Sequence, residues 1–201
     1  MIMATKTLTV LGDEKAGKKT LIGSLIYKCG LELTQLEALE REGVSQLNEI
    51  VPFYEKSSRV LSFYAPSGRI VVEIIESKEP DLAFWVLDAA ASMNWRSSAE
   101  ELRSLLSSGT LQPRERLLIL VNKIDGRDLV GWSEHTFTEV VRTFSAANLK
   151  TDRAYILPIS SLKGDNILGP LEGYSWMNDQ SASHPSSSVH VSERSLMDLL
   201  R

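Results

Sequence analysis

The chain has 201 residues, of which 43% are hydrophobic, and this is enough for one large globular domain with a sizeable core. The formal net charge of −4 provides no global positive field, so direct nucleic-acid binding is not supported by composition. The single cysteine, Cys29, rules out an internal disulfide, and neither a signal peptide nor a membrane-length apolar run is present, so we expect a cytoplasmic protein.

The first part of the chain predicts a strand, two helices and a hairpin. Residues 5–11 alternate polar and apolar types, as a strand does, and residues 17–28 and 32–42 have apolar residues at helical spacing. Two extended runs, 59–64 and 69–75, surround the turn sequence Ala-Pro-Ser-Gly. Because proline followed by Ser-Gly is turn chemistry, these two runs are expected to pair as a β-hairpin.

The second part alternates strands with helices. Apolar runs predict strands over 82–88, 116–121 and 154–159. Helical spacing predicts helices over 96–107, 134–147 and 193–200, and the serine-rich stretch 181–188 is interpreted as a loop. This alternation after an early hairpin predicts an α/β domain with a mostly parallel sheet, one antiparallel hairpin and helices on both faces.

A phosphate-binding loop follows the first predicted strand. The P-loop pattern is G-x-x-x-x-G-K-[ST], and Gly12, Gly17 and Lys18 satisfy it. Backbone N–H groups at the start of the following helix would point at phosphates, and Lys18 would reach the terminal ones. The predicted phosphate site comprises Gly12, Asp13, Glu14, Lys15, Ala16, Gly17, Lys18, Lys19 and Thr20.

Two further motifs follow two other predicted strands. Asn122, Lys123 and Asp125 form the N-K-x-D pattern of GTP-binding proteins directly after strand 116–121. The Asp125 carboxylate can accept two hydrogen bonds from guanine, while the stem of Lys123 would cover the face of the base and Asn122 would brace the loop.

The loop after strand 154–159 begins with Ser160, Ser161 and Leu162, whose backbone N–H groups would meet the guanine carbonyl oxygen. In parallel sheets ligands bind beyond the carboxyl ends of strands. Three motifs at three such ends predict a guanine nucleotide, GTP or GDP, as the ligand.

At this point the sequence resembles the GTP-binding domain of the eukaryotic elongation factor 1-alpha family, including its termination and ribosome-rescue relatives. The resemblance rests on the P-loop and on four segments: 25–30 (Leu-Ile-Tyr-Lys-Cys-Gly), 121–125 (Val-Asn-Lys-Ile-Asp), 157–166 (Leu-Pro-Ile-Ser-Ser-Leu-Lys-Gly-Asp-Asn) and 195–200 (Ser-Leu-Met-Asp-Leu-Leu). It implies a P-loop NTPase G-domain fold and a role in translation or RNA quality control. Two β-barrel domains follow the G domain in the family, and we expect residues 1–201 to be a single G domain without them.

The chain departs from the family at the metal-binding position. A serine or threonine normally ends the P-loop and ligates Mg²⁺, but Lys19 stands there. Its ammonium group would repel Mg²⁺ and could itself neutralise phosphate charge. Thr20 is a poor substitute, because one helical step rotates a side chain by about 100°. The sequence therefore makes Mg²⁺ binding doubtful and indicates no metal site.

Both switch segments of the family also lack their motifs. Residues 43–58 contain nothing like the first switch, although Ser57 and Ser58 offer hydroxyls. For the second switch, 64–68 (Tyr-Ala-Pro-Ser-Gly) could be a decayed copy with Tyr64 replacing the aspartate; alternatively, the hairpin 59–75 corresponds to the family's second and third strands, and Glu76 stands where the aspartate would be. The second alignment is favoured, and in both the catalytic histidine is missing.

Three hypotheses follow from these residues. The first is a pseudo-GTPase that binds guanine nucleotide but has impaired hydrolysis and switching. The second is a slow but active GTPase that uses Thr20 or water to hold Mg²⁺, and the third is a nucleotide-free scaffold for protein contacts. A protein of translation or RNA surveillance is the partner that the resemblance implies, and no catalytic residue is assigned.

Overall fold

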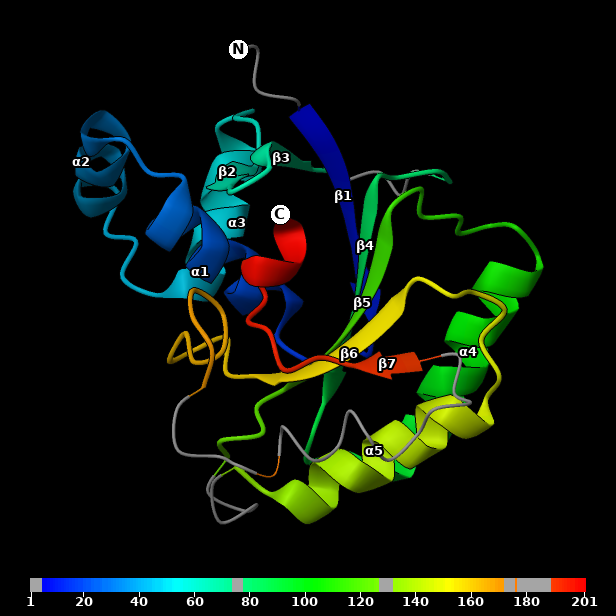
Figure 1. Cartoon of the computed structure of the whole chain (residues 1–201). Helices are drawn as coiled ribbons and strands as arrows, with labels where there is room; N and C mark the ends of the chain where they lie inside the picture. Colours follow the sequence, from blue (N-terminus) through cyan, green and yellow to red (C-terminus); the bar gives the residue numbers. More distant parts are fainter. Residues whose placement is uncertain (1–4, 74–77, 127–131, 172–175, 177–188) are drawn as a thin grey trace.

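The computed structural model describes residues 5–73, 78–126, 132–171, 176 and 189–201. Within these ranges the strands form one seven-stranded sheet in the order β2-β3-β1-β4-β5-β6-β7 (Figure 1). The strands are β1 (Thr5–Gly12), β2 (Ser62–Ala65), β3 (Gly68–Val72), β4 (Leu82–Asp88), β5 (Arg116–Asn122), β6 (Ala154–Ile159) and β7 (Val189–Val191). All neighbouring pairs are parallel except β2 and β3, so the predicted sheet with one antiparallel hairpin is confirmed.

Helices cover both faces of this sheet (Figure 1). The α-helices are α1 (Lys18–Cys29), α2 (Leu33–Arg41), α3 (Leu47–Lys56), α4 (Trp95–Ser107) and α5 (Glu134–Ala146). Short 3-10 turns in the described part of the chain are η1 (Ser92–Asn94) and η3 (Asp198–Leu200). None of the helices in the described ranges combines the length and the apolar content that a membrane span requires.

The central strands are buried on both faces, which divides the core into two clusters. Along β4, Phe84 and Val86 pack with α1, α3 and the C-terminal segment, whereas Trp85 and Leu87 pack with α4 and α5. This division follows from the alternation of side chains along a strand. A parallel strand covered on both faces needs apolar residues at every position, and β4 has them from Leu82 to Leu87.

Helix α3 is absent from the sequence prediction. Pro52 lies inside it and cannot donate the hydrogen bond of a helix interior, which hides the pattern. The helix forms because Ile50, Val51 and Tyr54 are buried and because Gln46 and Glu49 make a reciprocal capping box at its start.

Two further expectations at the C-terminal end need correction. A strand, β7, was not predicted, and its three residues are too short for a pattern. The helix predicted over 193–200 is wrong, because only the 3-10 turn Asp198–Leu200 forms. The backbone N–H groups of Leu196 and Met197 donate instead to the carbonyls of Asn166 and Ile167, so the segment is held by the loop after β6.

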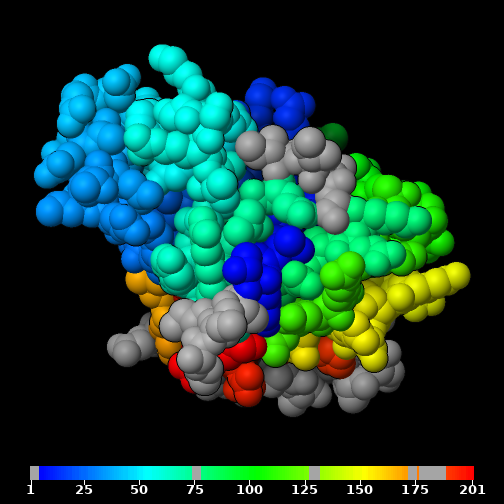
Figure 2. All heavy atoms as spheres, turned by 90° about the horizontal axis from the view of Figure 1, so that it is seen from above, coloured from blue at the N-terminus to red at the C-terminus, as the bar shows by residue number. Residues whose placement is uncertain are grey.

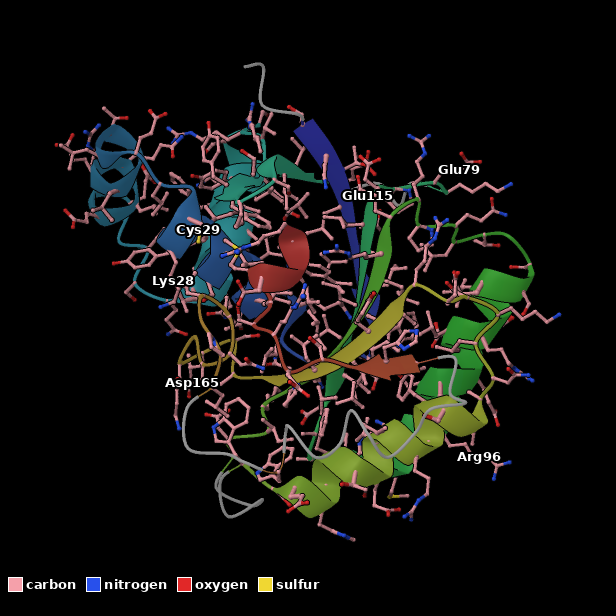
Figure 3. All side chains as sticks on the ribbon, in the orientation of Figure 1. Lys28, Cys29, Glu79, Arg96, Glu115 and Asp165 are labelled. Carbon is pink, nitrogen blue, oxygen red and sulfur yellow. The ribbon has the colours of Figure 1, made fainter. Side chains whose placement is uncertain are left out.

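Strand register brings the predicted motifs to one edge of the sheet. Gly12 is paired with Val86, Asp88 with Asn122, and Asn122 with Ile159. The strands β1, β4, β5 and β6 therefore end side by side. Glu115, labelled in Figure 3, lies at the opposite edge, where its carboxylate is 2.6 Å from the Lys6 ammonium.

Helices α2 and α3 form a lobe beside the body of the domain, seen in blue and cyan in Figure 2. The lobe is fixed to α1 at Gly23. A Cβ atom at this glycine would lie 1.8 Å from the carbonyl oxygen of Leu47, at the start of α3. The backbones of α1 and α3 thus approach more closely than a residue with a Cβ atom at position 23 would allow.

Replacing Gly23 by alanine is therefore expected to displace α3 and to lower the free energy of unfolding by about 3 kcal/mol. Gly169→Ala is the matched control, because a Cβ atom there would meet nothing within 4 Å. Chemical denaturation of the two variants and the parent chain measures the difference. Equal unfolding midpoints for both variants would contradict the close packing of α1 and α3.

Candidate nucleotide site

Three loops converge at the carboxyl edge of the sheet: the P-loop after β1, the segment 122–125 at the end of β5, and the segment 160–165 after β6. The sequence predicted each loop separately, and the structure brings all three together. Their contacts with one another come from a few side chains that cross between loops.

The P-loop has the backbone shape of a tight turn into a helix. Gly17 has φ of +96° and Lys15 has φ of +58°, and helix α1 begins at Lys18 without a side-chain cap. A Cβ atom at Gly17 would lie 2.5 Å from Nδ2 of Asn122, so only glycine fits both the conformation and the space. The first N–H groups of α1 consequently have no side-chain acceptor at the cap, which suits an anion.

The P-loop lysine is folded back on its own loop. Nζ of Lys18 donates to the carbonyl oxygens of Gly12 and Asp13, both at 2.6 Å. The Lys18 ammonium group therefore lies against the backbone of the P-loop, the predicted phosphate site.

Asn122 bridges two of the loops. Its Nδ2 donates to the carbonyl oxygen of Ala16 at 2.7 Å, and its Oδ1 accepts from the backbone N–H of Ser161 at 2.9 Å. The side chain is only 2% exposed, and both of its polar atoms are used. The amide thus holds the P-loop and the loop after β6 at a fixed separation.

Lys123 makes a second connection to the P-loop. Its Nζ donates to the carbonyl oxygen of Lys15 at 2.7 Å and to the carboxylate of Asp88 at 2.7 Å. Sequence reasoning did not identify Asp88. Its position as the last residue of a strand next to β5 is the only signal that points to it.

Asp125 is held by the loop after β6. Its carboxylate forms an ion pair with Nζ of Lys163 at 3.1 Å, and its side chain is 13% exposed, against 59% for Lys163. The Asp125 carboxylate is therefore sheltered from solvent and oriented by the exposed Lys163 ammonium group. A base that offers two N–H donors would meet it in this orientation.

The three residues 160–162 differ in their surroundings. Ser160 and Ser161 are buried, and their backbone N–H groups donate to Asp165 and Asn122, respectively. Leu162 is 74% exposed. Two of the three amides predicted to meet the base are thus already used inside the protein.

The residues at the metal position do not fit Mg²⁺. Lys19 is exposed and carries a positive charge, and Thr20, one residue further along α1, is half-buried. Within the described ranges no group of three or more His, Cys, Asp or Glu side chains is arranged to hold a metal ion. The position at which a hydroxyl oxygen was expected to ligate Mg²⁺ therefore presents an ammonium group instead.

The hairpin settles the alignment of the second switch. Tyr64 lies within β2 and Gly68 begins β3, which is parallel to β1, so the alignment that made 64–68 a decayed switch is wrong. The segment that follows β3 is residues 73–81, and it contains neither glycine nor histidine. Glu76, the predicted counterpart of the aspartate, lies outside the described residues.

The first switch region is occupied by packed helix. Helix α3 fills most of the stretch 43–58, and Ser57 ends it by donating from Oγ to the carbonyl oxygen of Phe53 at 2.8 Å. Ser58 has φ of +52° in the turn that follows. Both hydroxyl residues therefore belong to the end of a helix.

The fold and the three loops define a P-loop nucleotide-binding domain of the G-domain class. Known sequences agree: the model of the ADP-ribosylation factor family matches residues 77–181, just over half of the chain. Elongation factor 1-alpha of Serendipita indica is 24% identical, over 96% of this chain and 48% of that protein. Elongation factor 1-alpha of Aeropyrum pernix is 26% identical, over 85% of this chain and 46% of that protein.

Solved structures share the fold. The structure of Sup35 complexed with GMPPNP has a TM-score of 0.61 and 19% identity, covering 100% of this chain and 46% of that chain. The Saccharomyces cerevisiae Ski7 GTPase-like domain bound to GDP and inorganic phosphate has a TM-score of 0.57 and 18% identity, covering 82% and 44%. At these identities the likeness establishes the fold.

The chain thus belongs to the ADP-ribosylation factor family as that model defines it, and it is a G domain that resembles elongation factor 1-alpha. The resemblance predicted from the motifs is confirmed. The chain spans about half the length of the curated relatives that it matches.

The P-loop also contains a carboxylate that destabilises it. Burial raises the pKa of Asp13 above its ordinary value of 3.8, against the lowering effects of Ser98 and Lys18, and Asp88 raises it further. Its Oδ2 is buried and has no hydrogen-bond partner among the described residues. Because the folded pKa is the higher one, the protonated form favours folding, and this contribution is lost as pH rises through the folded pKa.

We therefore expect Asp13→Asn to raise the free energy of unfolding at pH 7 by about 1 kcal/mol or less, since solvent screens a half-exposed group. The gain should shrink as pH falls towards 4. Asp152→Asn is the control, because the Asp152 side chain is 93% exposed. Thermal unfolding across pH measures both variants, and a gain that does not vary with pH would contradict a raised pKa.

Proposed function

We propose that this chain binds GTP or GDP constitutively through the three loops and hydrolyses GTP poorly, as a pseudo-GTPase. The proposal rests on a contrast within this site between the residues that read the base and the residues that would bind metal and activate water. The base-reading residues are linked to the P-loop by direct hydrogen bonds, while the residues for metal binding and water activation are replaced.

In this proposal the phosphates lie against the backbone of residues 12–20. Lys18 exchanges its two carbonyl acceptors for phosphate oxygens, a small movement because these carbonyls belong to the same loop. The charge-assisted contact is stronger than the one it replaces. The N–H groups at the start of α1 provide the remaining donors.

Guanine is selected by Asp125, whose carboxylate accepts from the ring N–H and the exocyclic amine. Lys163 stays nearby and keeps the carboxylate oriented. The stem of Lys123 covers one face of the base, and the exposed Leu162 lies in the loop that faces the carbonyl edge. Adenine offers a different donor pattern and is rejected.

Hydrolysis requires a positioned water and stabilisation of charge on the transferred phosphoryl group. The segment 73–81 has no histidine to position the water, and Lys19 replaces the hydroxyl that ligates Mg²⁺. The Lys19 ammonium instead supplies positive charge beside the phosphates, so nucleotide binding does not require the metal. Switching is impaired as well, because α2 and α3 replace the segment that would respond to the terminal phosphate.

The cellular role follows by analogy with similar proteins. Sup35 complexed with GDP and the Ski7 GTPase-like domain bound to GTP share this fold, and elongation factor 1-alpha is a sequence relative. We therefore place the chain in translation or RNA quality control, in the cytoplasm, as a single G domain over residues 1–201 with a protein partner from these systems.

The testing experiment is thermal unfolding with GDP, GTP or ATP, each with Mg²⁺ and with EDTA. A ligand at 100 times its dissociation constant adds about 2.7 kcal/mol of stability. We expect guanine nucleotides to raise the melting temperature equally in both conditions and ATP to have no effect. A shift that EDTA abolishes, together with Mg²⁺-dependent turnover that Lys18→Ala removes, would establish a slow GTPase; no shift would leave a nucleotide-free scaffold.

Asp125→Asn is expected to weaken GDP binding by about 10- to 100-fold, because the amide cannot accept both donors of guanine. Inosine diphosphate lacks the exocyclic amine, so its affinity should fall less than that of GDP. The preference of the variant for GDP over inosine diphosphate should therefore be smaller. Titration calorimetry with both ligands gives this ratio. An unchanged ratio would show that Asp125 does not read the base.

A further inference from the structure

We infer that Asp88 is a positioning residue for guanine, acting through Lys123 and never touching the nucleotide. This inference rests on the proposed function. It assigns a role to a carboxylate that belongs to neither the P-loop nor the N-K-x-D motif. The chain of contacts runs from the end of β4 to the ammonium group and then to the P-loop.

The Asp88 carboxylate is itself well fixed. One oxygen, Oδ1, accepts from the backbone N–H of Ala90 at 2.9 Å, and the other, Oδ2, is 2.7 Å from Nζ of Lys123. The backbone carbonyl of Asp88 accepts from Nε1 of Trp95 at 3.1 Å, which ties the strand end to α4. The side chain is only 19% exposed, so solvent screens the pair less than it would screen one at the surface.

Lys123 is held at both of its ends. Its backbone has φ of +61°, and its Nζ is shared between Asp88 and the Lys15 carbonyl. The side chain therefore spans from the end of β5 to the P-loop, and 44% of it is exposed. A flat base can lie on a stem held in this way, because the stem has lost its rotameric freedom before the base arrives.

Without the carboxylate, one backbone carbonyl alone would hold the ammonium. Lys15, Lys18 and Lys19 place three further positive charges in the same loop, and a long lysine stem has several competing rotamers. Asp88 is the acidic group that directly offsets this repulsion at Lys123. Asp13 interacts with Asp88 electrostatically, and Asp88 is the carboxylate that forms the ion pair with Lys123.

If Asp88 positions Lys123 for the base, its loss should affect the binding of guanine and not the binding of phosphate groups. Guanine binding should weaken when Asp88 is altered, because the stem no longer covers the base. Binding of inorganic pyrophosphate, which has no base, should be unchanged. A general structural effect of Asp88 on the P-loop would weaken both ligands together.

The test is a double-mutant cycle on the full chain with Asp88→Asn, Lys123→Met and the double variant, measured with GDP and with pyrophosphate by calorimetry. We expect Asp88→Asn to weaken GDP binding by about five- to tenfold and the double variant to bind no more weakly than Lys123→Met. Additive losses, or an equal loss for pyrophosphate, would overturn the inference.

Two controls separate the possible failures. Glu115→Gln removes a 2.6 Å ion pair with Lys6 at the far edge of the sheet and should leave GDP affinity unchanged. Thermal unfolding without ligand shows whether each variant folds. If the parent chain binds no GDP, the proposed function fails and this inference falls with it; if the parent binds and the cycle is additive, only the role of Asp88 fails.

Discussion

The geometry of the site depends on one buried amide, that of Asn122. It donates to the P-loop and accepts from the loop after β6, so three strand ends are held in register by two hydrogen bonds. The Asn122 side chain is only 2% exposed. Its removal would leave the carbonyl of Ala16 and the N–H of Ser161 without these hydrogen bonds, in a place that water does not reach easily. The amide also requires a glycine at position 17, because a side chain there would collide with it. This part of the base-reading motif is therefore also part of the fold.

That double role changes how the motif should be interpreted. Asn122 and Lys123 both make contacts with other parts of the chain, so their presence alone does not distinguish a nucleotide-binding domain from a scaffold. Asp125 and Lys18 are different. Lys18 donates to carbonyls of its own loop, and Asp125 joins the loop after β6 only through an exposed lysine, where the buried Asn122 amide already holds that loop. The structural stability of the domain gives little reason to keep these two residues, whereas a guanine nucleotide gives a direct one.

Most of the fold could be predicted from the sequence because the central strands are uniformly apolar and the hairpin has a proline turn. Helix α3 could not, since Pro52 interrupts a pattern that burial of Ile50, Val51 and Tyr54 overrides. The convergence of the motifs was predictable because parallel strands end at the same edge. Asp88 was not, since its contact with Lys123 arises from the register between β4 and β5, which no local spacing reveals.

The same packing that was missed from the sequence determines what a bound nucleotide can do. A switch needs a segment with two arrangements of similar free energy, which the ligand distinguishes. Here α3 is locked against α1 at Gly23, and the connection from β3 to β4 is limited to residues 73–81. The close contact at Gly23 therefore disfavours a second arrangement of α3. The binding energy of a nucleotide would then appear as stability of the folded domain, because the three loops are already assembled. In the proposed pseudo-GTPase the nucleotide acts as a structural ligand, a role for which neither a metal site nor a catalytic histidine is needed.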